Sequence, residues 1–290
     1  MQNYAIFTDA TVDLPDSILH GGQVQILPME IAMEGKTLLF CHDWPEERIQ
    51  AFYEQLRAGK VAKTSQIAPY IYETAFEKVL QEGRDILYIC FSSGLSDTIQ
   101  AAQLVAKTLM DTYPDRKIRI VDSLGATFGE GLSVLRAVEN RASGMDIEEN
   151  ARQVTENVPH CSHWFTVDDL MYLKRGGRIS AATALVGSAL QIKPVMHMDD
   201  LGHLVPVSKA RGRKLSIKAI GEKLRQTALQ PESQVAYISH GGSKQDAQFL
   251  ADYLRSVVAL RDIVVSPLSP VIGAHSGPGT IALFFLGDRR

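Results

Sequence analysis

The first half of the chain alternates short apolar runs with longer amphipathic stretches. Residues 4–8, 85–91 and 118–121 are apolar almost throughout, which is typical of strands that are covered on both faces. Residues 24–27 indicate a further short strand. The predicted helices end near residues 57, 109, 141 and 158, and another begins at Pro69. The repeated order of strand, short loop and helix predicts a parallel, doubly wound α/β sheet.

The pattern changes at Pro159-His160, the best candidate for a domain boundary. Residues 195–198 and 204–207 flank the turn sequence Asp199-Asp200-Leu201-Gly202, which predicts a β-hairpin. Further strands are predicted over 164–167, 235–239, 263–265, 271–273 and 281–285, and further helices over 170–174, 215–227 and up to 257. Hairpins mixed with crossovers indicate a mixed sheet. We therefore expect two α/β domains, residues 1–158 and 159–290.

The composition is that of a globular protein without a dominant charge. Of 290 residues, 45% are hydrophobic and 22% charged, and the formal net charge is −3, so no overall basic field is present to hold nucleic acid. No apolar run approaches the ~20 residues that span a bilayer, and the N-terminus does not resemble a signal peptide. We expect a cytoplasmic protein without stable membrane insertion. The three cysteines are far apart and form no CxxC pair, which favours reduced thiols.

Four polar clusters follow apolar strands or lie between helices. Ligands of open α/β sheets bind at the carboxyl ends of strands, and hydroxyls beside the free N–H groups of a helix start favour an anion. A helix cap, a polar loop, a structural histidine and a solvated basic turn remain alternative interpretations. The clusters are Lys63-Thr64-Ser65-Gln66, Ser92-Ser93-Gly94-Leu95-Ser96, Lys174-Arg175-Gly176-Gly177-Arg178-Ile179, and Gly273 to Gly279 around His275.

Ser93 and His275 leave a serine-dependent acyl hydrolase open as an alternative function. The chain contains no G-x-S-x-G elbow, no phosphate-binding or dinucleotide-binding glycine loop and no H-E-x-x-H helix. His160-Cys161-Ser162-His163 carries metal-binding atoms but leads directly into a predicted strand. Alternation along a strand would turn His160 and His163 to opposite faces, so no metal site is expected there.

Taken in order, these clusters resemble the signature segments of the DegV family of bacterial fatty-acid-binding proteins. The resemblance covers the whole chain, and the ordered set is specific. Ala10, Asp97, Ala274 and Ser276 depart from the family's pattern. The matching segments are Asp9 with Asp13-Leu14, Lys63-Thr64-Ser65-Gln66, Ser92-Ser93-Gly94-Leu95-Ser96, Val121-Asp122-Ser123, Leu170 with Tyr172-Leu173-Lys174-Arg175-Gly176-Gly177-Arg178-Ile179, Lys193-Pro194 before a hairpin with Gly202, and His275 with Gly277-Pro278-Gly279.

The resemblance implies a carrier rather than an enzyme. It implies the family's two-domain fold, in which an acyl chain lies in an apolar tunnel between the domains. Hydroxyls and a histidine hold the carboxylate while a separate fatty acid kinase phosphorylates it. The implied ligand is a long-chain fatty acid of the palmitate, stearate or oleate class, bound by a monomer without metal or other cofactor. A carrier of another apolar carboxylic acid, such as a retinoid or isoprenoid, is a further alternative.

The resemblance also implies roles for individual residues. The stretch 181–192 (AATALVGSALQI) is small, apolar and uncharged, so it suits either a tunnel wall or an ordinary buried helix. The implied carboxylate contacts are Thr64, Ser65, Ser92, Ser93 and His275. The implied tunnel-lining residues are Ala184, Leu185, Gly187, Ser188 and Ile192, and the implied contacts to the kinase or the transferred phosphoryl group are Arg178 and Arg175.

Overall fold

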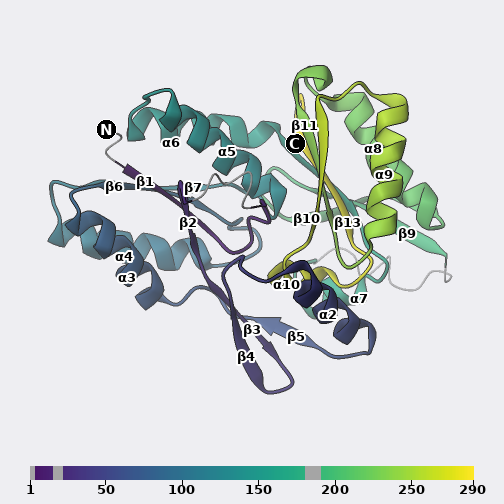
Figure 1. Cartoon of the computed structure of the whole chain (residues 1–290), viewed down its shortest axis with the longest axis horizontal. Helices are drawn as coiled ribbons and strands as arrows, with labels where there is room; N and C mark the ends of the chain where they lie inside the picture. The colour runs from purple at the N-terminus through teal and green to yellow at the C-terminus, as the bar shows by residue number, and fades with distance from the viewer. Residues whose placement is uncertain (1–3, 16–21, 180–190) are drawn as a thin grey trace.

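The structure is a computed structural model that describes residues 4–15, 22–179 and 191–290. Within these ranges the strands form sheets of four, three and six strands. Figure 1 shows the four-stranded sheet and its helices on the left, the six-stranded sheet on the right, and the three-stranded sheet projecting below them. The mixed α/β architecture predicted from the sequence is confirmed.

The four-stranded sheet is parallel throughout, as predicted. β1 and β6 are buried along almost their whole length because helices cover both faces of the sheet (Figure 1). In pairing order the strands are β2 (Val24–Leu27), β1 (Tyr4–Asp9), β6 (Asp85–Cys90) and β7 (Ile118–Asp122). One face carries α3 (Pro69–Gln81) and α4 (Thr98–Thr112), and the other carries α5 (Phe128–Ala142) and α6 (Ile147–Asn157).

A three-stranded antiparallel sheet lies outside the predicted pattern. It consists of β4 (Lys36–Phe40), β3 (Met29–Met33) and β5 (Ala62–Thr64), and α2 (Glu46–Arg57) follows β4 in the chain. Four of the five β4 residues are exposed and β5 has only three residues, so neither shows a readable alternation. Thr64 therefore ends a strand instead of lying in the predicted loop. Pro45 is the N-cap of α2.

The six-stranded sheet is mixed, as predicted. α8 (Arg213–Thr227) and α9 (Lys244–Val257) pack on one face, and α5 packs on the other. The predicted hairpin is confirmed by the antiparallel pairing of β9 and β10. In pairing order the strands are β10 (Leu204–Arg211), β9 (Ile192–Met198), β8 (Cys161–Thr166), β13 (Ile281–Leu286), β11 (Val235–His240) and β12 (Asp262–Pro267). The short elements η1 (Val158–His160), α7 (Met171–Arg175) and η3 (Pro231–Ser233) connect them.

The strand predicted over 271–273 is wrong, because these residues belong to helix α10 (Pro270–Ser276). Ser269 caps the helix by accepting a hydrogen bond from the N–H of Ile272, and Pro270 occupies the first turn. The apolar run is too short for its periodicity to separate a helix from a strand. α10 packs against α2, β3 and β5, so its fold depends on contacts with the first half of the chain.

The strands of each sheet lie on one side of the predicted domain boundary, but hydrophobic packing joins residues from both sides of it. Strands of the four- and three-stranded sheets lie within residues 4–122, and those of the six-stranded sheet lie within 161–286. Val271 and Ala274 of α10 nevertheless belong to the same buried cluster as residues of the first half. The division at residue 158 stays a prediction. Among the described helices, none has both the length and the apolar character needed to cross a bilayer.

Candidate functional site

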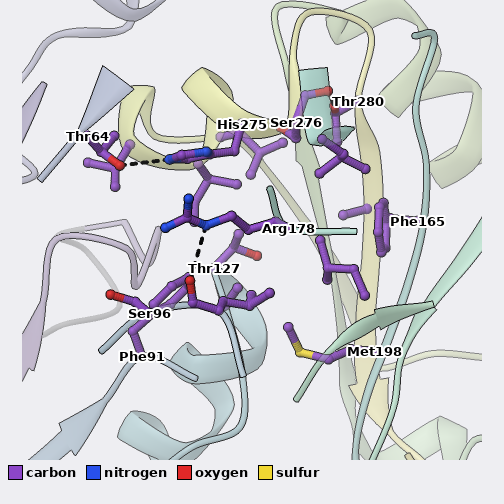
Figure 2. A pocket seen from close by; sticks show the side chains of 18 of the residues that line it. Thr64, Phe91, Ser96, Thr127, Phe165, Arg178, Met198, His275, Ser276 and Thr280 are labelled. Carbon is purple, nitrogen blue, oxygen red and sulfur yellow. Dashed lines mark hydrogen bonds between the residues drawn. The ribbon is translucent and has the colours of Figure 1, made fainter. Parts of the chain in front are cut away.

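A cavity of about 430 Å³ lies between the two halves of the chain. Segments that follow β5, β6 and β7 form one wall, and β8, β13, α10 and the β9–β10 hairpin form the other. The cavity thus lies where an open parallel sheet binds its ligands, beyond the carboxyl ends of its strands. In Figure 2, Thr64, His275, Arg178 and Ser96 lie on the left of the cavity, and Phe165 lies on the opposite side.

The cavity has an exposed polar mouth and a buried apolar interior. Ser65, Gln66 and Asp97 line it and are exposed, so this side opens to solvent. The lining residues farther in are buried and mainly apolar, and they come from β8, β9 and β13: Phe165, Met198, Ala282 and Phe284. A ligand with one polar end and a long apolar body would match this division.

Thr64 and His275 form the central polar pair of the mouth. The Thr64 Oγ1 atom lies 2.7 Å from His275 Nε2 (Figure 2), although 211 positions separate the two residues. β5 carries Thr64 to the cavity, and the last turn of α10 carries His275. Gly176 permits this placement, because a Cβ atom there would lie only 2.5 Å from His275 Nδ1. The first glycine of the basic turn therefore leaves room for the histidine ring, whereas Gly177 has open space around it.

His275 is neutral near pH 7. Burial, reinforced by the positive charge of Arg178, lowers the pKa of His275 to about 4. Nδ1 is buried without a hydrogen-bond partner among the described residues. We assign the proton to Nε2, since a buried N–H without an acceptor costs more than a bare lone pair. His275 then donates to Thr64 Oγ1 and leaves the hydroxyl proton of Thr64 free to point into the cavity.

Arg178 places a fixed positive charge on the cavity wall. Its Nε atom donates to the carbonyl of Leu95 at 3.2 Å, and its Nη1 atom donates to the carbonyl of Gly176 at 2.5 Å. Within residues 4–15, 22–179 and 191–290, Arg178 forms no ion pair, so its charge is available to an anion. Arg175 does not line the cavity: it is exposed, and its guanidinium lies 4.7 Å from the centre of the Tyr172 ring.

The three serines after β6 have different surroundings. Ser92 is fully buried and its Oγ atom donates to the carbonyl of Gly202 at 2.9 Å, which ties the hairpin turn to this loop. Ser93 is exposed and does not line the cavity. Ser96, a member of the predicted cluster that was not among the implied carboxylate contacts, does line it; its Oγ atom lies 2.8 Å from Thr98 Oγ1 and accepts from the N–H of Thr98 at 3.3 Å. The S-S-G-L-S motif marked the right loop without showing which serine faces inward.

The predicted tunnel-lining segment falls almost entirely outside the described residues. Ala184, Leu185, Gly187 and Ser188 belong to 180–190 and cannot be placed. Ile192 is described: it begins β9, pairs with Arg211 and is not among the residues that line the cavity. The apolar lining that is described comes mainly from sheet residues and α10. Thr127 and Thr280 also line the cavity and lie outside the predicted clusters, whereas Gln66 and Ser276, which line it too, belong to them.

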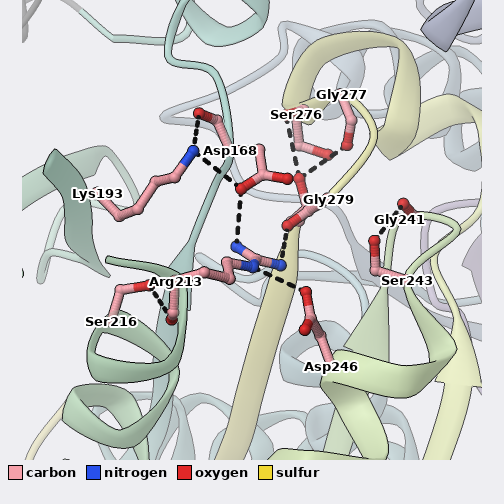
Figure 3. A network of polar contacts seen from close by, with 11 residues as sticks. Asp168, Lys193, Arg213, Ser216, Gly241, Ser243, Asp246, Ser276, Gly277 and Gly279 are labelled. Carbon is pink, nitrogen blue, oxygen red and sulfur yellow. Dashed lines mark hydrogen bonds and ion pairs between the residues drawn. The ribbon is translucent and has the colours of Figure 1, made fainter. Parts of the chain in front are cut away.

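The turn after α10 is held by a network around Arg213 (Figure 3). Nε of Arg213 donates to Asp246 Oδ2 at 2.8 Å, and Nη2 donates to the carbonyl of Gly279. Asp168 lies 3.5 Å from Arg213 Nη1 and accepts from Lys193 at 3.0 Å. The basic run 209–214 thus contributes one arginine that fixes the loop beyond His275. No cluster of three or more metal-binding side chains occurs in the described residues.

A pair of buried carboxyl groups lies beneath the serine loop. Asp9 accepts hydrogen bonds from the N–H groups of Thr11 and Phe91, both at 3.0 Å, and thereby fixes the end of β6. The hydroxyl of Thr11 lies 2.5 Å from Asp9 Oδ1 and 2.6 Å from Glu130 Oε2. One hydroxyl proton cannot serve both, so one carboxyl is protonated. Burial, and then repulsion from Asp9, raises the pKa of Glu130 well above its ordinary value.

Comparison with known proteins gives matches over the whole chain. Residues 3–288 match the model of the DegV family, whose members are described as uncharacterised. A DegV domain-containing protein of Clostridium perfringens is 38% identical over 290 residues, covering 100% of this chain and 99% of the relative. The structure of a DegV family protein of Thermus thermophilus with fatty acid binding has a TM-score of 0.87 at 28% identity and covers 98% of this chain and 99% of its own.

A second solved structure agrees with the first. A hypothetical protein of Thermotoga maritima, whose structure reveals fatty acid binding function, has a TM-score of 0.84 at 29% identity. It covers 98% of this chain and 99% of its own. The similarity therefore includes both halves of the chain.

Proposed function

The chain belongs to the DegV family, and from this premise we propose that it binds a long-chain fatty acid in the cavity between its two halves. The carboxylate would lie at the mouth beside Thr64, Ser96 and Arg178, and the hydrocarbon would extend toward Phe165 and Phe284. The observation that carries the proposal is the convergence of the Thr64–His275 pair and of Arg178, which forms no ion pair with the described residues, on a cavity whose interior is apolar.

The apolar interior would supply most of the affinity. Each buried methylene contributes about 0.8 kcal/mol, so a dozen of them contribute roughly 10 kcal/mol before the loss of ligand freedom is counted. The cavity of about 430 Å³ falls within the range of small-molecule sites. The preferred length and unsaturation of the acyl chain would then depend on the shape of the cavity at its inner end.

The polar mouth would orient the ligand. A carboxylate that leaves water needs hydrogen-bond donors, or it becomes protonated. Thr64 offers its hydroxyl proton once His275 donates to its oxygen, Ser96 offers its own once the Thr98 hydroxyl donates to it, and Arg178 offers the positive charge. In this arrangement His275 is a positioning residue and Thr64 touches the ligand.

We propose further that the bound carboxylate is presented to a separate kinase. The kinase would transfer the γ-phosphoryl group of ATP to a carboxylate oxygen, with ADP as leaving group and an acyl phosphate as product. Support comes from the exposed mouth, which leaves the carboxylate within reach of another protein. Arg178 could bind the transferred phosphoryl group with its planar fork, and the exposed Arg175 suits contact with the partner.

The acyl hydrolase alternative lacks the geometry that it requires. A nucleophilic serine must lie within hydrogen-bond reach of its base. Ser93 is exposed and lies outside the cavity lining, and the Nε2 atom of His275 is engaged by Thr64. We therefore retain the carrier function alone.

The binding proposal is tested with delipidated protein. We expect palmitate or oleate to bind, and lipid extraction of freshly purified protein to yield a long-chain fatty acid; a retinoid or isoprenoid acid instead would identify the other apolar-acid carrier. Arg178→Met should weaken binding roughly 10- to 100-fold, the usual value of a hydrogen bond to a charged group. Arg175→Met is the matched control and should bind normally. Repeatedly empty protein that takes up no added fatty acid would refute the proposal.

The kinase proposal has its own readout. With ATP and the kinase subunit of a fatty acid kinase, the loaded protein should yield acyl phosphate, trapped as the hydroxamate. Arg175→Met, which leaves ligand binding intact, should slow this step if Arg175 contacts the partner. Fatty-acid binding without any acyl phosphate from a kinase that is active with another carrier would count against presentation while leaving binding intact.

A further inference from the structure

Thr127 places an unpaired hydroxyl inside the cavity. The residue is the N-cap of α5, lines the cavity and is 3% exposed. Its Oγ1 atom is buried and has no hydrogen-bond partner among the described residues. It does not cap its own helix, since no side-chain hydrogen bond is made there. Buried hydroxyls are normally paired, so an unpaired one facing a ligand cavity indicates a group that the ligand supplies.

The backbone of Thr127 is held in an unfavourable conformation. Its φ of 55° and ψ of −134° lie in a region that β-branched residues rarely adopt. Strain of this kind persists where the surrounding structure imposes it, and it concentrates at ligand sites. A glycine or a small polar residue would meet the backbone requirement at lower cost. The combination of strain and an unused hydroxyl is therefore not explained by the fold alone.

Thr127 belongs to the inner part of the cavity rather than to its mouth. α5 packs against β8 and β13, the strands that supply Phe165 and Phe284. Figure 2 shows Thr127 between the Thr64–His275 pair and the apolar end marked by Phe165 and Met198. At the mouth Ser65, Gln66 and Asp97 are exposed and the Thr64–His275 pair is half-buried, whereas Thr127 and these apolar neighbours are buried. A fatty acid anchored at Thr64 would therefore pass Thr127 with its hydrocarbon and not with its carboxylate.

We propose that Thr127 recognises an oxygen-bearing group on the ligand's hydrocarbon chain, so that the cavity selects hydroxy or oxo long-chain acids over unsubstituted ones. This inference rests on the proposed fatty-acid binding. The Thr127 hydroxyl both donates and accepts, and so pairs with a chain hydroxyl or a keto oxygen. An unsubstituted chain leaves it buried and unpaired, which lowers affinity relative to a chain that satisfies it.

The test compares stearic acid with a series of hydroxystearic acids that differ in the position of the hydroxyl. Calorimetric titration of the delipidated full chain should show at least one isomer that binds more tightly than stearic acid, by roughly tenfold. Thr127→Val keeps the β-branched shape and removes the hydroxyl. It should abolish that preference and bind stearic acid more tightly, because no unpaired hydroxyl remains. Thr127→Ser keeps the hydroxyl and should retain the preference.

Three results would overturn the inference. The first is a wild-type protein that prefers no isomer over stearic acid, a result that does not depend on any variant folding. The second is the same preference in wild type and Thr127→Val. The third is an equal loss of affinity for every ligand in Thr127→Val, which would assign Thr127 to the carboxylate. In each case stearic acid still binds the wild type; failure of all long-chain acids to bind would instead refute the carrier function itself.

Discussion

Replacing Glu130 by Gln should stabilise the protein, and the gain should grow as the pH rises. Glu130 is fully buried, shares the Thr11 hydroxyl with Asp9, and also accepts from the hydroxyl of Thr8 at 2.6 Å. Burial raises the pKa of Glu130 well above its ordinary value, and the charge of Asp9 adds to this. The folded protein therefore holds a proton there that the unfolded chain, with a pKa of about 4.3, releases.

The sign and the size of this pH dependence of stability follow from proton linkage. Below a pH of about 4 both states are protonated, and the pair contributes no pH dependence. Above that, folding takes up one proton, so the free energy of unfolding falls by about 1.4 kcal/mol per pH unit until the folded pKa is reached. Glu130→Gln needs no proton. Its advantage should therefore grow as the pH rises through this window, less roughly 1 kcal/mol for hydrogen bonds that the amide reproduces poorly.

Buried histidines make the stability rise with pH, which is opposite to the effect of Glu130. Comparing the variant with the wild type cancels their contribution. Burial lowers the pKa of His163, His240 and His275, so the unfolded chain binds more protons at these sites below about pH 6.5. Stability rises with pH across that window in the wild type and the variant alike. Only the difference between the two curves reports Glu130.

Urea denaturation at pH 5, 6, 7 and 8, followed by circular dichroism, measures that difference. Glu139→Gln is the control, since Glu139 is an exposed carboxyl on the same helix, and it should follow the wild type at every pH. A difference between Glu130→Gln and wild type that stays constant from pH 5 to pH 8 would show that the folded protein holds no extra proton, and the assignment of a protonated pair would be refuted.

Three further outcomes are expected. Ser92→Ala should lower the free energy of unfolding by about 1–3 kcal/mol in urea denaturation, because the Gly202 carbonyl loses its buried donor; an unchanged midpoint would contradict this. Gly176→Ala should reduce fatty-acid affinity by displacing His275, whereas Gly177→Ala, with a φ of 71° and open space around it, should reduce stability by about 1 kcal/mol but not affinity. Equal affinity losses would refute the steric argument. Fatty-acid affinity measured from pH 6 to pH 8 should be constant, because the pKa of His275 is about 4; a step near pH 6.5 would contradict a neutral histidine.

Long helices and strands with one clear hydrophobic periodicity were predictable from the sequence. β6 is apolar in sequence and buried except at Asp85, β7 is buried at Ile118 and Val121, and α3 begins at the predicted Pro69. The hairpin of β9 and β10 follows from its turn sequence. These elements carry their pattern within a few neighbouring residues, so local sequence is enough to identify them.

Short elements were not predictable, because other parts of the chain stabilise them. β5 has three residues and exists through its pairing with β3. α10 has seven residues, and the same apolar letters are compatible with a strand until Ser269 and the contacts with α2 are known. Isolated pieces of this length do not hold a conformation in water.

The sequence by itself determined the α/β class, the order of the polar clusters and four residues that line the cavity: Thr64, Ser65, Arg178 and His275. Only the tertiary structure decided that Ser96 rather than Ser93 lines the cavity, that Ser92 is a structural hydroxyl, and that Thr127 lies among apolar side chains. The physical reason is that the direction of a side chain at the end of a strand depends on the turn it enters, and the neighbours it meets come from segments as distant as the 211 positions between Thr64 and His275.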